Sequence, residues 1–290
     1  HEQINVDYGS TDDSADILRG FGNDPRVGLH FQENRGAHAA LNRGLELARG
    51  DLAFILDSDD VYENDRVVDL ADRLRSNPDA ALAASWIRVI DVAGAEIGIK
   101  KAWRTLPPWP APSRGPLLSE LGEPRLAMLE TNWISTTSNL AFPMRLIRDH
   151  GLRFAPLRYA HDWDFILTLA ALGAIDLVEE PLLRYRVHGA NTIGGGDGAD
   201  RGRMRFEIMW VVARHARRIL GSAAPPEANP SELRERLSRS APTFGHDSIF
   251  DQLLVLRGDG DAGPPAYDAL LDPTHRFTRA AIDVLQTDDR

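Results

Sequence analysis

Three aspartates follow directly on an apolar stretch near the start of the chain. In 51-DLAFILDSDD-60 the apolar run ends at Leu56, and Asp57, Asp59 and Asp60 come next. Carboxylates this close together repel one another unless a positive group lies among them. Asp57 and Asp59 are two positions apart in a turn, so both can reach one divalent cation, and Mg²⁺ and Mn²⁺ prefer oxygen ligands. The spacing predicts a divalent cation that also binds a diphosphate.

An acidic helix start is the alternative explanation for these carboxylates. Asp near a helix N-terminus stabilises the helix by about 0.3–1 kcal/mol, which suits Asp60 and Glu63 but not an acid at the very end of a buried strand. A calcium-binding EF-hand loop does not fit, because the fifth and sixth positions counted from Asp57 are Val61 and Tyr62 rather than an acid and a glycine. We therefore interpret Asp60 as a helix-start residue and keep the other two aspartates as metal ligands.

Short β-type runs alternate with helical periodicity through the first 95 residues. Strands are expected at residues 4–7, 27–31, 52–56 (fully buried) and 80–92, the last with a hairpin at Ala93-Gly94. Helices are expected up to Arg19 after a capping box of Ser10 and Asp13, over 37–50, and along the stripe of Val67, Leu70, Ala71 and Leu74. This alternation predicts βαβ units and a mainly parallel sheet. Ligands bind at the carboxyl ends of strands in such a sheet, where the aspartates lie.

The rest of the chain has weaker patterns. Helices are expected over 143–151, 162–172 and 204–220, an apolar run over 175–180, and a strand over 182–189. Residues 103–116 form a proline-rich loop with two tryptophans, which suits either a sugar- or lipid-contacting surface or a loop packed over the core. The glycine-rich segment 194–203 is a linker or a lid. We expect an α/β domain over residues 1–193, and a lid or linker with a helical C-terminal region over 194–290.

Composition and charge exclude several classes of protein. The chain has 290 residues, and its 43% hydrophobic and 26% charged residues are typical of globular proteins. A net charge of −10 argues against nucleic acid or anionic lipid as the main partner. The absence of cysteine excludes disulfides and zinc–thiolate sites, and no apolar run approaches the ~20 residues of a membrane span. The expected location is the cytoplasm, with peripheral membrane contact as an open alternative.

Five segments of the chain occur together in the order and spacing of a known family. They are 6-VDYGSTDDS-14, 34-NRGAHAALNRGL-45, 50-GDLAFILDSDD-60, 161-HDWDFIL-167 and 184-RYRVHGANT-192. Over about residues 1–193 the chain resembles family 2 glycosyltransferases with the GT-A fold, of the bacterial type that builds polysaccharides and glycoconjugates. The resemblance implies an α/β fold and transfer of a sugar from a nucleotide diphosphate donor, with inversion, to an acceptor hydroxyl. It also implies Mn²⁺ or Mg²⁺ as cofactor, a UDP-sugar as the favoured donor, and a glycan, lipid-linked or small-molecule acceptor.

The resemblance assigns roles to the metal ligands and the base. Asp57 and Asp59 match the DXD motif, with Asp59 as the more direct ligand of the metal on the leaving diphosphate. Asp162 matches the general base, which must reach the acceptor oxygen; an N-cap of the following helix is its other role. His161 stands where the family usually has Glu. His188 matches a histidine that can approach the metal or the diphosphate, and a structural histidine is the alternative.

The resemblance also assigns the donor pocket. Its members are Asp7, Tyr8, Gly9, Ser10, Asn34, Gly36, Asn42 and Ser58. Backbone amides in the turn after Asp7 suit phosphate or ribose oxygens. Tyr8 stands where the family often has a second acid; it either stacks on the base or occupies a variable position. For Asn34, Gly36 and Asn42 a turn followed by an ordinary helix is the alternative.

The family's first strand and helix would precede residue 1. We therefore expect roughly 30–45 residues upstream, the length of a strand–turn–helix unit, and weakened nucleotide binding without them. A GT-A-like domain that binds a nucleotide sugar or a partner without catalysis is the main alternative function. Such a domain would be expected to lose Asp57, Asp59 or Asp162, and the chain keeps all three. A glycoside hydrolase would not need metal-binding acids at a strand end, and a dinucleotide oxidoreductase would need G-x-G-x-x-G.

The expected helix over 204–220 is both basic and apolar. Its arginines at 205, 214, 217 and 218 stand among Ile208, Trp210, Val211 and Val212. Two interpretations follow: docking on an anionic membrane that carries a lipid-linked acceptor, or packing against the catalytic domain.

Overall fold

The computed structural model describes residues 1–101, 117–189, 201–224, 227, 229–256, 268–272 and 274–287. The proline-rich loop over 103–116 and the glycines of the expected lid at 194–198 lie outside these residues. Arg201, Gly202 and Arg203, which we assigned to the linker, are helical.

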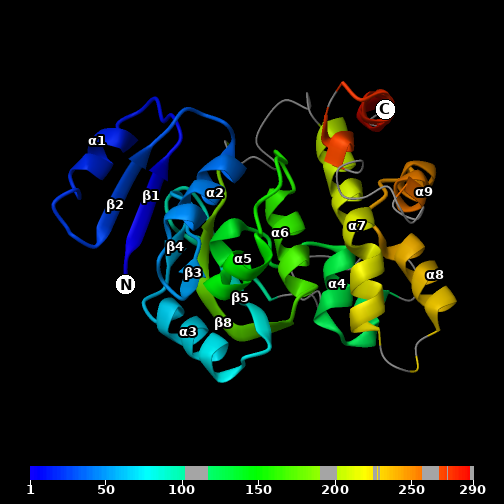
Figure 1. The fold of residues 1–290 in the computed structure, drawn as a ribbon, viewed down its shortest axis with the longest axis horizontal. Coiled ribbons are helices and arrows are strands. Elements are labelled where there is room, and N and C mark those ends of the chain that lie inside the picture. Colours follow the sequence, from blue (N-terminus) through cyan, green and yellow to red (C-terminus); the bar gives the residue numbers. More distant parts are fainter. Residues whose placement is uncertain are drawn as a thin grey trace.

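Three parts of the molecule follow one another along its long axis (Figure 1). A small unit lies at one end and a larger sheet with its helices lies in the middle. A group of helices lies at the other end. The small unit consists of β1 (Gln3–Asp7), α1 (Ser14–Arg19) and β2 (Val27–Phe31). The far group includes α7 (Arg201–Ala223), α8 (Pro230–Ser240), α9 (Asp247–Leu256), η3 (Ala269–Leu271) and α11 (Arg276–Thr287).

The central sheet has six strands and mixed pairing. Its strands are β3 (Leu52–Phe54), β4 (Val61–Tyr62), β5 (Ala80–Ile90), β6 (Glu96–Lys100), β7 (Ala141–Pro143) and β8 (Ala174–Arg186). The order is β3-β7-β5-β8-β4, with β6 paired to β5. Only β5 and β8 are parallel in this sheet, and β1 and β2 form a separate parallel pair. The sheet is thus mixed rather than mainly parallel, in part because β6 returns through the predicted hairpin at Gly94 (φ 86°), and such a turn joins only antiparallel strands.

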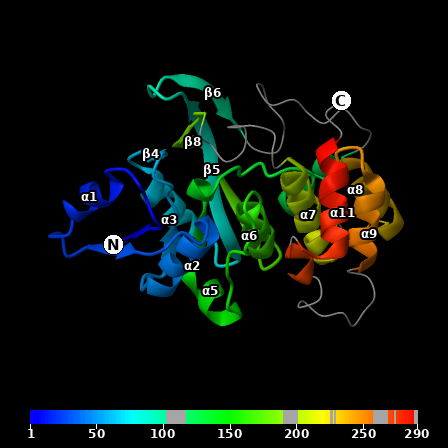
Figure 2. The same cartoon turned by 90° about the horizontal axis from the view of Figure 1, so that it is seen from above.

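Helices flank the long strands β5 and β8 at the centre of the molecule (Figure 2). They are α2 (Ala37–Leu47), α3 (Arg66–Ser76), α5 (Met144–His150) and α6 (His161–Ala170), with α4 (Pro124–Glu130), η1 (Leu118–Leu121) and η2 (Thr137–Asn139) in the connections. The rings of Phe154 and Phe165 stack at 3.9 Å between centroids in the core beside β7. The same core includes α7, whose Trp210, Val211 and Val212 are fully buried. The prediction that this helix packs on the protein is therefore confirmed.

Several element boundaries differ from the expected ones. The strand expected at 52–56 stops at Phe54, its residues are only partly buried, and Leu56 is 49% exposed. The separate run and strand expected over 175–189 form one strand, β8, which passes Pro181 with a shift in register. The capping box is not formed, because α1 begins at Ser14 and its N-cap Asp13 makes no side-chain bond. The helix expected to close at residue 50 ends at Leu47.

None of the helices in the described residues combines the length and apolar composition that crossing a membrane requires.

Candidate active site

The turn after β3 holds Asp57 through a buried polar segment. The Asp57 amide donates to the Ser138 hydroxyl at 2.9 Å, and its carboxylate accepts hydrogen bonds from the hydroxyls of Thr137 and Thr136, the latter at 3.4 Å. All three partners belong to the stretch around η2 and are buried. We did not anticipate this segment from the sequence, although the polar run 135-STTSN-139 between apolar residues was a signal for it.

Asp59 lies next to His188, a predicted metal ligand 129 residues away in the chain. His188 Nε2 is 2.9 Å from Asp59 Oδ2, and both side chains are partly exposed. Arg186 strengthens this junction, because its Nε donates to the Asp59 carbonyl at 3.0 Å. The end of β8 is thus fastened to the turn of residues 57–60, which we call the acidic turn.

Asp60 does not start a helix, so that interpretation was wrong. Helix α3 begins at Arg66, and Asp60 is 6% exposed with Oδ1 accepting from the Arg186 amide at 2.9 Å. Its Oδ2 is buried without a hydrogen-bond partner. The pKa of Asp60 is raised to about 6, mainly by burial; hydrogen bonding with Ser138 and Arg186 lowers it, and the charges of Asp59 and Asp57 raise it. Glu63 is not a helix-start residue either; it forms an ion pair with Arg184 at 2.7 Å.

Replacing Asp60 by Asn is expected to stabilise the metal-free protein above pH 7. The folded-state pKa of about 6 exceeds the ordinary aspartate pKa of 3.8, so the native state binds the extra proton between these values. Stability therefore falls as pH rises through this window, and the loss is complete above about pH 6. The gain from Asp60→Asn should be on the order of 2 kcal/mol at pH 8 and near zero at pH 4. Urea denaturation with chelator at both pH values measures it, and an equal effect at pH 4 and pH 8 would contradict the assignment.

Arg66 supplies a buried positive charge beneath the acidic turn. It is fully buried, and its guanidinium donates to the Ser85 hydroxyl at 2.6 Å, the Asn139 side-chain oxygen at 3.1 Å and the Ser138 carbonyl at 3.2 Å. Burial lowers the pKa of Arg66, and the attraction of Asp60 partly offsets this. Arg66 therefore fixes η2, which in turn holds Asp57, and part of the acidic charge is balanced without any bound ion.

The acidic turn suits a cation that arrives with a substrate. No group of three or more His, Asp or Glu side chains able to hold a metal ion occurs within the described ranges. Asp59 and His188 form a pair, while hydroxyls already bond the Asp57 carboxylate. Mg²⁺ is usually held by one or two carboxylates plus substrate phosphates. The donor set thus fits a divalent cation completed by a diphosphate.

Asp162 lies in the first turn of α6, and both of its oxygens are held in place. Oδ1 accepts from the Trp163 amide at 2.7 Å, and Oδ2 accepts from the Asn132 side-chain amide at 2.8 Å. The N-cap is Ala160, so Asp162 is not the helix cap. Burial raises the pKa of Asp162, His161 and the hydrogen bonds lower it, and the charge of Asp57 raises it again. A raised pKa suits a group that must accept a proton.

The charges of the acidic turn and of Asp162 both act on Tyr185. Burial raises the pKa of Tyr185 to about 12, and the charges of Asp60, Asp59, Asp162 and Asp57 add to the effect. These carboxylates come from the turn after β3 and from α6, and Tyr185 comes from the end of β8. Sequence reasoning did not single out this tyrosine.

Helix α7 positions the start of α6. The buried Glu207 accepts hydrogen bonds from the amides of Arg158, Tyr159 and Ala160 at 2.7–3.3 Å. It is also paired with Arg203 at 2.9 Å. The loop that leads into Asp162 is therefore fixed by the C-terminal part of the chain.

Asp164 serves the same junction rather than the chemistry. Its Oδ1 lies 2.8 Å from His215 Nε2 and 3.1 Å from Arg214 Nη1 of α7. Burial would raise the pKa of Asp164, but these partners hold it below its usual range. Asp164 therefore contacts α7.

The predicted donor-binding residues form the turns after β1 and β2. Asp7 Oδ1 accepts from the amides of Gly9 at 2.8 Å and Ser10 at 3.0 Å, and these bonds lower the pKa of Asp7. Gly9 has φ +97°, and an added Cβ would lie 3.5 Å from Asn34, so the two turns meet. Burial raises the pKa of Tyr8, and the charges of Asp57 and Asp59 also raise it, which places its ring near the acidic turn.

Asn34, Gly36 and Ser58 complete this edge, whereas Asn42 has a different position. The Asn34 side chain accepts from the Gly36 amide at 3.0 Å, and Gly36 (φ +88°) is the N-cap of α2. Ser58 is exposed in the acidic turn. Asn42 donates to the Phe154 carbonyl at 3.0 Å and accepts from its amide at 2.8 Å. Its amide is engaged with the protein backbone.

Replacing Asn42 by Ala is expected to destabilise the protein by about 2 kcal/mol. The change removes two hydrogen bonds and leaves the amide and carbonyl of Phe154 unpaired in a partly buried place. Urea denaturation measures the loss, and Asn23→Ala at an exposed position is the control. Equal stability of the two variants would show that the bridge contributes nothing.

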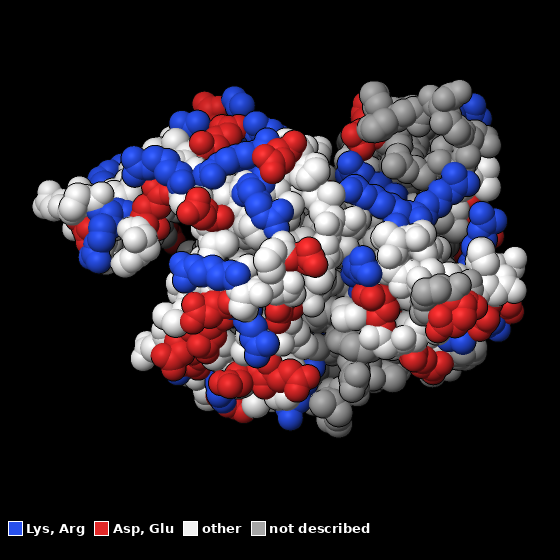
Figure 3. All heavy atoms as spheres, turned by 60° about the horizontal axis from the view of Figure 1, so that its bottom comes forward, with Lys and Arg blue, Asp and Glu red and all other residues white. Residues whose placement is uncertain are grey.

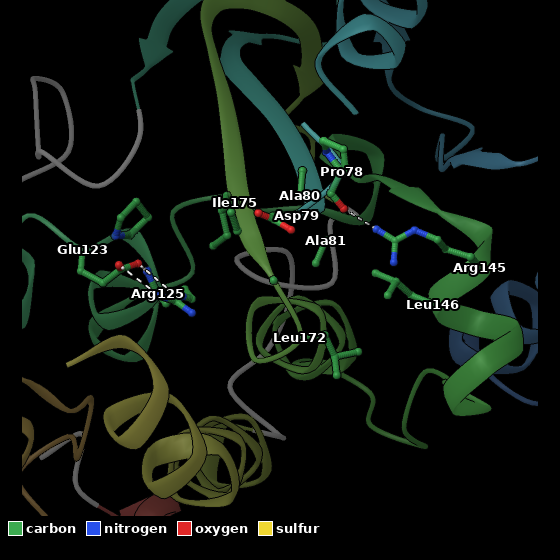
Figure 4. Close-up of a pocket in the computed structure, with 13 residues that line it drawn as sticks. Pro78, Asp79, Ala80, Ala81, Glu123, Arg125, Arg145, Leu146, Leu172 and Ile175 are labelled. Atoms are coloured by element: carbon green, nitrogen blue, oxygen red, sulfur yellow. Dashed lines mark hydrogen bonds and ion pairs between the residues drawn. The ribbon is translucent and has the colours of Figure 1, made fainter. Parts of the chain in front are cut away.

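A pocket of about 550 Å³ lies at the other end of β5 and β8 (Figure 4). Ala80, Ala174 and their neighbours line it, together with Arg125 and Arg145. The two arginines are engaged locally: Arg125 is paired with Glu123 at 3.0 Å, and Arg145 donates to the Pro78 carbonyl at 2.7 Å. None of the predicted site residues lines this pocket.

Comparison with known proteins identifies the family. The sequence model of glycosyl transferase family 2 matches residues 1–120. An uncharacterized glycosyltransferase of Nostoc sp. is 28% identical over 195 residues, which is 66% of this chain and 56% of that protein. Chondroitin synthase of Escherichia coli is 29% identical over 187 residues, 64% of this chain and 24% of that enzyme. The chain thus spans about half or less of the length of these relatives.

Solved structures show the same fold. The S. aureus TarS fragment 1–349 in complex with UDP-GlcNAc matches with a TM-score of 0.60 at 18% identity, covering 98% of this chain and 80% of that one. The mannosyltransferase PcManGT from Pyrobaculum calidifontis, in complex with GDP-Man and Mn²⁺, matches with a TM-score of 0.50 at 16% identity, covering 98% and 76%. Identities this low show the fold alone. The chain therefore has the GT-A fold, and its residues 1–120 match the sequence model of glycosyl transferase family 2.

Proposed function

We propose that this glycosyltransferase uses a divalent metal and inverts the anomeric carbon, and that it acts in polysaccharide or glycoconjugate synthesis. The observation that carries the proposal is the convergence of Asp57, Asp59 and His188 with Asp162 at one end of the sheet. Residues 57–59 lie in one turn, His188 lies 2.9 Å from Asp59, and the charge of Asp57 raises the pKa of Asp162. Inverting transfer needs these two functions close together: a place for the diphosphate and a base beside the sugar.

The reaction assigns each group one task. Asp162 takes the proton of the acceptor hydroxyl while the acceptor oxygen bonds to the anomeric carbon. The bond from that carbon to the donor diphosphate breaks, and its electron pair leaves with the diphosphate. Asp59 and His188, with Asp57 behind them, would hold Mn²⁺ or Mg²⁺, which neutralises the charge that develops on the leaving diphosphate. Arg66 and the hydroxyls of η2 keep the acidic turn in place.

The donor proposed is a UDP-sugar. Asp7 and the amides of Gly9 and Ser10 form a rigid turn whose neighbour Tyr8 lies close to the acidic turn. An aromatic ring at this position suits stacking on the base of the donor nucleotide. The TarS relative was solved with UDP-GlcNAc and with UDP, which supports uridine as the first base to test.

The acceptor proposed is a glycan, a lipid-linked sugar or a small molecule. The relatives include chondroitin synthase and a succinoglycan biosynthesis protein of Rhizobium meliloti, both connected by name with polysaccharides. Charges of both signs are interspersed over the face shown in Figure 3, and the net charge is −10. Membrane contact through α7 would rely mainly on its arginines, because most of its apolar side chains are buried.

A screen of nucleotide sugars tests the proposal. Nucleoside diphosphate release is measured with each donor and a mixture of acceptors, in Mn²⁺, Mg²⁺ or chelator. We expect one donor class to give metal-dependent release. A non-catalytic domain would bind a donor without releasing its diphosphate under any of these conditions.

A further inference from the structure

Lys100 reaches the site from the edge strand β6. It is the last residue of that strand and is paired with Ile87 of β5. Its ammonium donates to the Asn132 carbonyl at 3.2 Å and to the Ser135 hydroxyl. Burial lowers the pKa of Lys100 to about 8, and the charge of Asp162 opposes this shift, so the two groups are close enough to interact.

Asn132 connects this lysine to Asp162. The Asn132 side-chain amide donates to Asp162 Oδ2 at 2.8 Å, and its side-chain oxygen accepts from the Ser135 amide at 3.0 Å. Ser135 has φ +79°, a conformation that non-glycine residues rarely adopt. The loop of residues 132–135 is therefore a closed, strained unit, and Lys100 bonds to it at two points.

Several polar and charged groups surround Asp162, and Lys100 is one of them. His161 precedes Asp162 on α6, Asp57 faces it from the acidic turn, and Tyr185 faces it from β8. Lys100 and Asn132 complete this shell. Lys100 contributes an ammonium group to this shell, and the charge of Asp162 acts on it.

We propose that Lys100 is a positioning residue for the general base. Through Asn132 it sets the direction of the Asp162 carboxylate and keeps a positive charge beside it. The inference rests on the proposed function, in which Asp162 is the base. Each Asp162 oxygen accepts one bond from the protein and keeps a lone pair for the acceptor hydroxyl. An unanchored 132–135 loop would let that direction drift, and small misplacements of reacting groups cost large factors in rate.

Three variants separate this role from a structural one. Lys100→Met removes the charge at similar length, and Lys100→Arg keeps the charge. Lys101→Met is the matched control, because Lys101 lies 5.0 Å over the Trp86 ring. We expect Lys100→Met to lower kcat roughly 10- to 100-fold with little change in the donor KM. Lys100→Arg should recover most of the rate, and Lys101→Met should stay within about twofold of the parent.

The pH profile gives a second readout. The parent enzyme should lose activity with an alkaline midpoint near pH 8, where Lys100 gives up its proton, while Lys100→Arg should stay active past that pH. Carboxyl ¹³C NMR, with Asp162→Asn to assign the signal, measures the base directly. Lys100→Met should raise the pKa of Asp162, because it removes a positive charge beside the carboxylate, and Lys101→Met should leave it unchanged.

The outcomes distinguish this inference from the proposed function. If Asp162→Asn abolishes transfer while Lys100→Met keeps the parental rate and the parental Asp162 pKa, the role of Lys100 is overturned. If Asp162→Asn keeps full transfer, the base assignment fails, and the NMR titration still decides whether Lys100 controls the Asp162 carboxylate. Thermal unfolding of each variant shows whether Lys100→Met is folded. If it is not, the rate and alkaline profile of Lys100→Arg decide: a midpoint still near pH 8 contradicts the proposal.

Discussion

Replacing Asp162 by Asn is expected to lower the rate of sugar transfer by about a thousandfold, because the amide cannot take the proton of the acceptor hydroxyl. Asn keeps the size of the side chain and can still accept from the Trp163 amide. The donor should therefore bind as before, and its KM should change by no more than about twofold. Steady-state kinetics with the donor found in the screen measures both values.

The control for this prediction is Asp149→Asn on α5. Asp149 is exposed and lies outside the site, so its loss should leave kcat unchanged. Full transfer by Asp162→Asn would show that another group takes the proton. A loss confined to KM would show that Asp162 binds a substrate and does not act as the base.

Replacing Asp59 by Ala is expected to lower transfer by at least about a hundredfold and to weaken the response to Mn²⁺. The change removes the carboxylate that lies 2.9 Å from His188. A metal on a leaving diphosphate contributes several kcal/mol of charge stabilisation, and 2.7 kcal/mol corresponds to about a hundredfold in rate. His188→Ala should act in the same direction. Rates measured as a function of Mn²⁺ concentration give the apparent metal affinity of each variant.

Glu63→Gln is the matched control, because Glu63 forms an ion pair with Arg184 of strand β8 at 2.7 Å. A partly exposed ion pair of this kind contributes about 0–1 kcal/mol to stability, and it does not touch the acidic turn. Its rate and metal response should stay within about twofold of the parent. Equal rates for Asp59→Ala and Glu63→Gln, or an unchanged response to Mn²⁺, would show that Asp59 does not bind a catalytic metal.

The sequence was most informative where a function depends on residue type and local spacing. Asp57 and Asp59 stand two positions apart, and a carboxylate pair after a strand already predicts a cation. The structure places His188 beside Asp59, as expected, and Asp164 in the α6–α7 junction. Asp57 and Asp59 could be identified because their spacing within a segment carries the information, whereas His188 was assigned through the resemblance to the family.

Asp60 shows that neighbouring residues in the sequence do not determine the environment of a side chain. Its neighbours in the sequence suggested a helix start, but its environment is set by Arg186, 126 residues away. The same holds for Lys100, Asn132 and Glu207, which act through contacts between distant segments. No periodicity in a short window can reveal such contacts.

Strand pairing, too, could be predicted where it depends on local sequence and not where it depends on distant segments. The hairpin at Gly94 was predicted, because a glycine turn between β-type runs is local. The single strand β8 was divided in two at Pro181, since proline cannot donate a ladder hydrogen bond. The structure accommodates this proline through a shift in register against β5. The antiparallel pairing of β7 with β3 and β5 depends on how the whole chain packs.

Calorimetric titration of UDP into the protein, with Mn²⁺ and then with chelator, tests whether the turn at residues 57–59 binds a diphosphate through a divalent cation. We expect the affinity for UDP measured in Mn²⁺ to fall at least about tenfold in chelator and in Asp59→Ala. The same affinity for UDP in Mn²⁺, in chelator and in Asp59→Ala would contradict this mode of binding.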